Sequence, residues 1–75
     1  MEEELMTKLV QVERKVFHFS LRQNPRGRFL KVTEDVGGRR DAIIIPSTGL
    51  GQIRDAIDQI IQADNAAGPL PPPIP

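Results

Sequence analysis

The sequence predicts an α+β fold in which a four-stranded antiparallel sheet is followed by one C-terminal helix. Apolar residues recur at every second position through much of residues 1–46, which is typical of strands, and at helical spacing over residues 47–64. Gly, Pro and Asn residues interrupt the first part at intervals of about ten residues, as expected of short strands joined by tight turns. With 75 residues, the chain has enough material for one small domain.

The alternation also predicts two different faces of the sheet, because successive side chains of a strand point to opposite sides. One set of positions is apolar and is expected to lie against the helix: Phe17, Phe19, Leu21, Leu30 and Val32. The other set is polar and basic with one aromatic, and it is expected to form an open face: His18, Ser20, Arg22, Phe29, Lys31 and Thr33.

Three turns separate the four expected strands. The segments Asn24-Pro25-Arg26-Gly27 and Gly37-Gly38 have the composition of tight turns, and a short junction near Arg14 provides the third. The fourth strand contains Ile43-Ile44-Ile45, so it is apolar on both sides. We expect both sides to be covered, either by the chain's own helix or by a second subunit.

One amphipathic helix is expected over residues 47–64. Pro46 ends the preceding strand, and the hydroxyl of Ser47 or Thr48 is expected to cap the first turn. Gly68 is one expected stop, and fraying after Ala63 is the other. One side of the helix carries an apolar stripe: Leu50, Ile53, Ile57, Ile60 and Ile61.

An ordered domain over residues 7–67 is expected between two flanking segments. Residues 1–6 contain three consecutive glutamates and are expected to be an acidic N-terminal extension. Residues 68–75 hold five of the seven prolines, which prevent a regular ladder or helix, so we expect a Pro-rich flexible tail. A ligand for a proline-recognising groove and a joint to a further segment are the alternatives for this tail.

Composition excludes several classes of function. The chain has no cysteine and one histidine, so it lacks the side chains for a disulfide or for a thiolate or imidazole zinc site. No apolar run approaches the roughly 20 residues that span a bilayer, and the acidic start is unlike a secretory signal. We therefore expect a soluble intracellular protein without membrane contact. A domain of this size without disulfide or metal usually needs a partner chain.

Catalysis is also not expected. The chain has no cysteine nucleophile, its single histidine has no recognisable partner, and no glycine-rich phosphate loop is present. The carboxylates are scattered, without sign of a buried pair. We expect no enzyme, no small-molecule substrate, no metal and no cofactor.

The charges are unevenly distributed, although the formal net charge is zero. Between Arg14 and Arg40 there are eight basic and two acidic residues, a net charge of +6. Guanidinium groups bind phosphates and base edges and stack on bases, and an asparagine amide both donates and accepts at a base. The expected hairpin over residues 22–32 gathers such groups, and Phe29 and His18 offer stacking surfaces for unpaired bases. The alternative is a solvated basic hairpin with Phe29 in a dimer core.

The run Phe17-His18-Phe19-Ser20-Leu21-Arg22-Gln23-Asn24-Pro25-Arg26-Gly27-Arg28-Phe29-Leu30-Lys31-Val32 closely resembles one repeat of the PUR family of purine-rich-element-binding proteins. The segments Ile43-Ile44-Ile45-Pro46 and Ile53-Arg54-Asp55-Ala56-Ile57 extend the resemblance, which covers about residues 7–64 and is strongest to plant-type members. Residues 7–67 are thereby identified as a single PUR repeat.

The resemblance implies that two repeats intertwine by exchanging helices, so the expected partners are a second copy or another PUR repeat. It also implies binding of purine-rich, especially G-rich, single-stranded DNA or RNA, in transcription, replication or RNA regulation, in the nucleus, the cytoplasm or both. An assembly-only dimerisation repeat is the alternative. The expected nucleic-acid-binding residues are Arg22, Gln23, Asn24, Arg26, Arg28, Phe29, Lys31 and His18. The expected dimer interface comprises Leu50, Ile53, Ile57, Ile60, Ile61 and Ile44.

Overall fold

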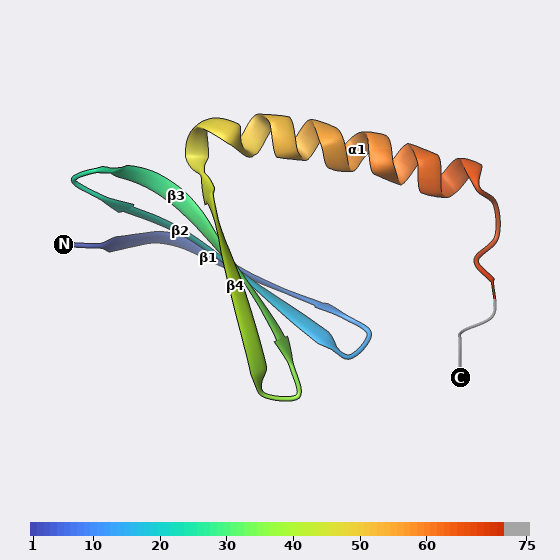
Figure 1. The fold of residues 1–75 in the computed structure, drawn as a ribbon, viewed down its shortest axis with the longest axis horizontal. Coiled ribbons are helices and arrows are strands. Elements are labelled where there is room, and N and C mark those ends of the chain that lie inside the picture. Colours follow the sequence, from blue (N-terminus) through green and yellow to red (C-terminus); the bar gives the residue numbers. More distant parts are fainter. Residues whose placement is uncertain (72–75) are drawn as a thin grey trace.

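The computed structural model describes residues 1–71 and confirms the predicted order of four strands followed by one helix (Figure 1). The strands pair with their sequence neighbours in one antiparallel sheet of order β1-β2-β3-β4. A single 3-10 turn, Ser47–Gly49, joins the sheet to the helix. The elements are β1 (Glu3–Val12), β2 (Lys15–Asn24), β3 (Gly27–Val36), β4 (Arg39–Pro46) and α1 (Leu50–Ala66).

The three turns lie where the sequence predicts them. Glu13 and Arg14 connect β1 to β2, Pro25 and Arg26 connect β2 to β3, and residues 37–38 connect β3 to β4. Gly37 and Gly38 have φ angles of 59° and 88°, a left-handed backbone that glycine adopts without steric cost. The turn chemistry thus explains why the chain reverses at this point.

Strand β1 begins earlier than the sequence suggests. Residues 3–6, which the sequence analysis sets apart in an acidic extension, lie inside β1 and pair with the end of β2. The pairing is irregular between Glu4 and Met6, where Leu5 forms a bulge. Charge patterning alone predicts an acidic extension here, because it contains no information on the partners that β2 supplies.

The start of α1 also differs from the expectation. Neither Ser47 nor Thr48 caps it, because both hydroxyl residues lie within the 3-10 turn and Gly49, which has no side chain, occupies the N-cap position. The end agrees with the predicted stop. Gly68, with a φ angle of 86°, donates its backbone N–H to the Asn65 carbonyl at 3.2 Å. The last four residues of the expected tail, 72–75, lie outside the described residues.

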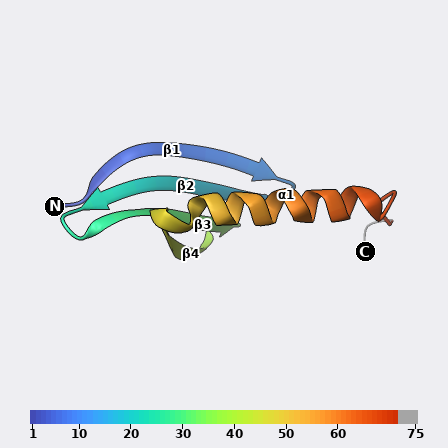
Figure 2. The same ribbon diagram turned by 90° about the horizontal axis from the view of Figure 1, so that it is seen from above.

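The helix does not cover the sheet of its own chain, which corrects the expectation that the apolar stripe would lie on the apolar side of the sheet. Helix α1 runs away from the sheet beyond the end of β4, and it contacts chiefly the turn before it (Figures 1 and 2). Its first residue, Leu50, reaches the sheet, where it shares a hollow with Leu21 and Leu30. The radius of gyration is 15.3 Å, whereas a compact domain of this length has about 11 Å.

The chain consequently has no hydrophobic core of its own. Among the described residues no hydrophobic side chain is buried, and Ile57 and Ile61 of the stripe are each 50% exposed. The sheet has an uncovered side as well, which we call the apolar face. The strand register assigns to it the hydrophobic residues Met6, Val10, Phe17, Phe19, Leu21, Leu30, Val32, Ile43 and Ile45, with Lys8 between Met6 and Val10.

Candidate nucleic-acid interface

The opposite side of the sheet, which we call the polar face, gathers several of the predicted site residues. Cross-strand partners point to the same side of a sheet, and Arg22 pairs with Phe29, Ser20 with Lys31 and His18 with Thr33. The predicted polar set therefore does lie on one face. Neighbouring strands add to it Glu4, Thr7 and Leu9 from β1, and Arg40, Ala42 and Ile44 from β4.

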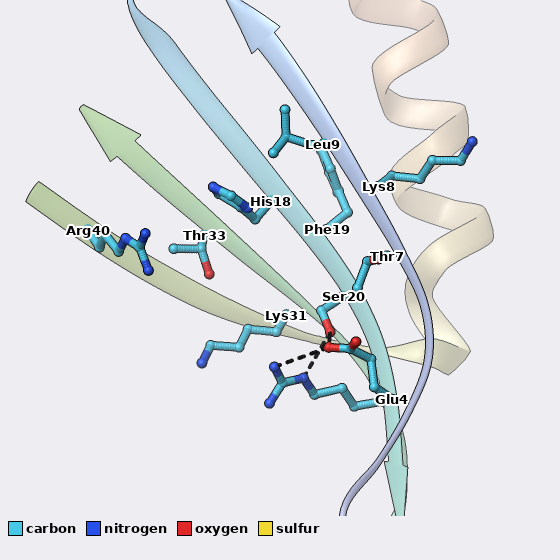
Figure 3. A pocket seen from close by; sticks show the side chains of 11 residues that line it. Glu4, Thr7, Lys8, Leu9, His18, Phe19, Ser20, Lys31, Thr33 and Arg40 are labelled. Atoms are coloured by element: carbon cyan, nitrogen blue, oxygen red, sulfur yellow. Dashed lines mark hydrogen bonds and ion pairs between the residues drawn. The ribbon is translucent and has the colours of Figure 1, made fainter. Parts of the chain in front are cut away.

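The polar face is hollowed at its centre. The hollow measures about 530 Å³ and is open to solvent (Figure 3). The cationic side chains that line it on the polar face come from three strands, Arg22 in β2, Lys31 in β3 and Arg40 in β4. A fourth cation of the lining, Lys8 in β1, pairs with Phe19, and its side chain points away from the hollow. In Figure 3, Thr33 lies between Arg40 and Lys31, and its cross-strand partner His18 lies beside it. The remaining lining residues are Glu4, Thr7, Leu9, Phe19 and Ser20.

The cations of this region differ in their partners. Arg40 Nε lies 3.0 Å from an Asp35 carboxylate oxygen, and the other Asp35 oxygen accepts the Gly38 backbone N–H at 3.1 Å. Within residues 1–71, no carboxylate forms an ion pair with Lys31 or Arg26. These two cations are therefore available to an external anion.

Arg22 is the most constrained cation. Its Nη1 atom lies 2.8 Å from a Glu2 carboxylate oxygen and its Nη2 atom 3.5 Å from Glu4, while Nε donates to Ser20 Oγ at 2.9 Å. Ser20 Oγ in turn donates to Glu4 at 3.0 Å, and Ser20 is 8% exposed, the one buried polar residue of the described chain. The guanidinium is thus held on the polar face by three side chains.

The hairpin turn uses Asn24 in a way that its sequence context does not reveal. The side-chain oxygen Oδ1 accepts the backbone N–H groups of Arg26 at 2.9 Å and Gly27 at 3.2 Å. This Asx-type arrangement satisfies the turn. Gly27 has a φ angle of 153°, which residues with a side chain rarely adopt. The acceptor end of Asn24 is therefore engaged, and its amide Nδ2 is the end that remains for a ligand.

Two of the eight predicted binding residues point to the other side of the sheet. Gln23 pairs with Arg28 in the register and accepts hydrogen bonds from its guanidinium at 3.1 and 3.3 Å. Gln23 also donates to Glu3 at 3.2 Å. The family resemblance implies that these residues share one site with Arg22 and Phe29, whereas strand alternation directs the two sets of side chains to opposite sides of the sheet.

A second, smaller hollow of about 220 Å³ lies at the hairpin end of the sheet. Phe29 lines it together with Ile44 and Pro46, which are partners of Lys31 and Phe29 on β4. Asn24, Arg26, Gly27 and Arg28 complete the lining. Ile44, predicted as a dimer residue, therefore lies on the polar face beside Phe29, opposite the apolar face.

Sequence reasoning missed Glu2, Glu4 and Arg40 as residues of this face. Arg40 could have been found from the register, because it follows a two-residue turn and pairs with Asp35. The glutamates could not, since the bulge at Leu5 changes the phase of β1.

The described residues contain no group of three or more His, Cys, Asp or Glu able to hold a metal, and none of their helices has the length and apolarity needed to cross a membrane.

Comparison with known proteins places these features in context. Residues 2–62 match a family described as PurA ssDNA and RNA-binding protein. The chain is 41% identical over 61 residues to Transcription factor Pur-alpha 1 of Arabidopsis thaliana, covering 81% of this chain and 21% of that protein. It is 32% identical over 72 residues to the Homo sapiens Transcriptional activator protein Pur-alpha, covering 95% and 22%. The Homo sapiens Transcriptional regulator protein Pur-beta is 30% identical over 71 residues, covering 93% and 23%. The chain thus spans about a fifth of the length of these relatives.

Proposed function

Because this chain belongs to the PurA family of single-stranded DNA- and RNA-binding proteins, we propose that it binds purine-rich, especially G-rich, single strands through its polar face. The relatives are named as transcription factors and regulators. We extend to this chain a role in transcription, replication or RNA regulation, in the nucleus, the cytoplasm or both. Binding rather than catalysis is the proposed activity.

The observation that carries this proposal is the combination of free cations with an apolar platform at the hairpin end. Lys31 and Arg26 have no carboxylate partner in residues 1–71, and Phe29 lies beside Ile44 and Pro46. A single strand offers a phosphate and an exposed base face at every nucleotide, and this pairing of groups suits both. The donor end of Asn24, at the same hollow, is suited to an acceptor on a base edge.

We further propose that two copies intertwine and exchange their helices. The apolar face and the stripe of α1 are both uncovered in one chain. Each is a hydrophobic surface that the other could bury. The helix projects from its own sheet (Figures 1 and 2), and this supports the proposal that it covers the apolar face of a partner. Such an exchange supplies the missing core. Pairing with another PUR repeat would satisfy the same surfaces.

The assembly-only alternative is less well supported. Dimer formation would use the apolar face and the helix, which leaves the polar face without a role in assembly. A repeat that served assembly alone would have no need for Lys31 and Phe29 on the exposed side.

Fluorescence anisotropy tests the binding proposal. A labelled G-rich single strand, a pyrimidine strand of equal length and a duplex are each titrated with the protein at two salt concentrations. We expect preference for the G-rich strand, and an affinity that falls by about 0.7 log units per decade of salt for each phosphate contacted. Equally weak binding to all three nucleic acids, or binding to none of them, would refute the binding proposal.

Light scattering on the same samples tests the dimer, which has twice the mass of the chain.

A further inference from the structure

Two acidic residues, Glu2 just before β1 and Glu4 within it, lie on the surface that the proposed function assigns to nucleic acid. Glu2 and Glu4 both place a carboxylate oxygen at the Arg22 guanidinium, at 2.8 and 3.5 Å. Two negative charges thus surround one positive charge, and Ser20 Oγ ties Glu4 to the Arg22 Nε group at 3.0 and 2.9 Å. The polar face therefore carries an internal anion at one of its predicted ligand-binding cations.

The bulge at Leu5 creates this arrangement. In an uninterrupted strand, Glu4 and Met6 would point to the same side, because the side-chain period is two residues. In β1, Glu4 pairs with Arg22 on the polar face, whereas Met6 pairs with Leu21 on the apolar face. The extra residue re-aims the glutamate, which is a common effect of bulges near functional surfaces. Glu3, which lies between Glu2 and Glu4 in the sequence, accepts a hydrogen bond from Gln23 on the other side of the sheet.

The carboxylates and a phosphate compete for the same donors. Ser20 occupies Nε of Arg22, and the glutamates occupy one side of each terminal nitrogen. A phosphate that approached these nitrogens would also meet the negative charge of both glutamates at close range. By contrast, no carboxylate of residues 1–71 is paired with Lys31 on the same face.

The ion pairs of Glu2 and Glu4 with Arg22 can be broken at low cost. Strand β1 is an edge strand that pairs only with β2, so its first residues can separate without disrupting the remaining sheet. The Glu2 and Glu4 side chains are 45% and 53% exposed, and ion pairs in contact with solvent are weak. An exchange of one anion for another at Arg22 is therefore reversible.

We propose that Glu2 and Glu4 act as an internal competitor that occupies Arg22 in the free protein. A nucleic-acid phosphate then binds Arg22 only by displacing these two carboxylates. The proposal rests on the proposed function of the polar face, and it concerns the regulation of that site. It makes the N-terminal glutamates restraints on affinity rather than part of a solvated extension.

The first test compares two doubly neutralised variants with equal net charge. Glu2→Gln with Glu4→Gln removes both Arg22 partners, whereas Glu3→Gln with Glu13→Gln removes two charges of β1 and its turn that do not contact Arg22. In the anisotropy titration we expect the first variant to bind the G-rich strand roughly three- to tenfold more tightly than wild type. The second is expected to gain clearly less. Equal gains in both, or no gain in the first, would overturn the proposal.

A second comparison repeats the Glu2→Gln, Glu4→Gln substitutions in an Arg22→Gln background. The gain is expected to disappear there, because the competitor no longer has a cation to occupy. A gain of unchanged size would mean that the glutamates act through long-range repulsion, and it would refute the internal contact as the cause. Thermal unfolding of all variants checks that the fold is retained.

A third readout needs no nucleic acid and separates this proposal from the proposed function. The Nε–H resonance of Arg22 is followed by NMR during titration with inorganic phosphate. We expect it to respond at lower phosphate concentration in the Glu2→Gln, Glu4→Gln variant than in wild type. If the variant responds at lower phosphate but no form of the protein binds the strand, the competition at Arg22 is supported and the proposed function is refuted. If the strand binds but the two phosphate responses are identical, the proposed function is supported and the competition at Arg22 is refuted.

Discussion

The side-chain oxygen of Asn24 accepts the backbone N–H of Arg26 at 2.9 Å, so the residue expected to read a base also closes the hairpin. A second bond, from the Gly27 N–H at 3.2 Å, uses the same oxygen. The proposed function therefore divides two roles between the two ends of one amide: Oδ1 serves the turn, and Nδ2 is left to donate to a ligand. This division makes the contribution of Asn24 experimentally separable.

We predict that Asn24→Asp retains the hairpin but weakens single-strand binding. A carboxylate accepts the two turn N–H groups as the amide oxygen does, whereas it cannot donate and it repels phosphate. Asn24→Ala is expected to lose the turn bonds as well, at a cost of about 1 kcal/mol in unfolding free energy. Anisotropy and urea unfolding measure the two effects. Gln23→Glu is the control, since it adds the same charge one residue away on the other side of the sheet, and an equal loss of affinity there would contradict a specific role for Asn24.

Phe29 is predicted to supply a stacking platform on the polar face. Phe29→Ala should weaken binding of the G-rich strand by about 1–3 kcal/mol, the range for one stacked base, while Phe29→Tyr retains the ring and should bind close to wild type. Neither substitution changes the charge of the protein, so the affinity for the strand should depend on salt concentration to the same extent in both variants. If Phe29 belongs to a dimer core instead, the alanine variant will lose dimer mass in light scattering before it loses affinity.

The dimer proposal predicts that Ile57→Asp prevents assembly. Ile57 is half exposed in one chain, and in an exchanged dimer it would be buried, where an unpaired carboxylate is strongly unfavourable. Gln59→Asp is the matched control, because it adds the same charge to the opposite side of α1. We expect the first variant to lose both dimer mass and cooperative unfolding, and the control to keep both. A folded Ile57→Asp dimer would place the interface elsewhere.

Much of the sheet was predictable because its signal is local. The alternation of β2 and β3 is unbroken from Phe17 to Thr33 apart from the turn, so the period of two assigns Arg22, Phe29 and Lys31 to the same face without any structure. The same rule separates Gln23 and Arg28 from them. The motif groups all of these residues in one site, whereas the period of two predicts on which side of the sheet each side chain lies.

The features that sequence did not predict depend on contacts between distant segments. The bulge at Leu5 has no composition signal, yet it decides that Glu4 lies beside Arg22 and not beside Met6. The stripe of α1 shows that the helix must be covered, but the same stripe suits its own sheet and that of a partner. In the structure, the linker Ser47–Gly49 directs α1 away from the apolar face of its own sheet.

A cross-strand ion pair between Lys15 and Glu34 predicts how stability depends on alkaline pH. Lys15 Nζ lies 2.9 Å from a Glu34 oxygen. The hydrogen bond to Glu34, with the charge of Glu34 and a smaller contribution from Glu13, raises the pKa of Lys15 above its ordinary value of 10.5. A lysine with a raised pKa in the folded state stabilises that state below its unfolded pKa. This contribution is lost as the pH rises through the folded pKa.

Neutralising either partner should therefore flatten the alkaline part of the stability curve. We expect the unfolding free energy of wild type to fall more steeply than that of Lys15→Gln or Glu34→Gln between about pH 10 and 12. The difference will be small, because both side chains are partly exposed, at 54% and 36%. Urea unfolding at one fixed protein concentration measures it, since assembly makes stability concentration-dependent. Lys31→Gln removes a lysine without an ion-pair partner in residues 1–71 and should keep the wild-type slope. If it flattens the curve as much as Lys15→Gln, the slope reflects total lysine charge and not this pair.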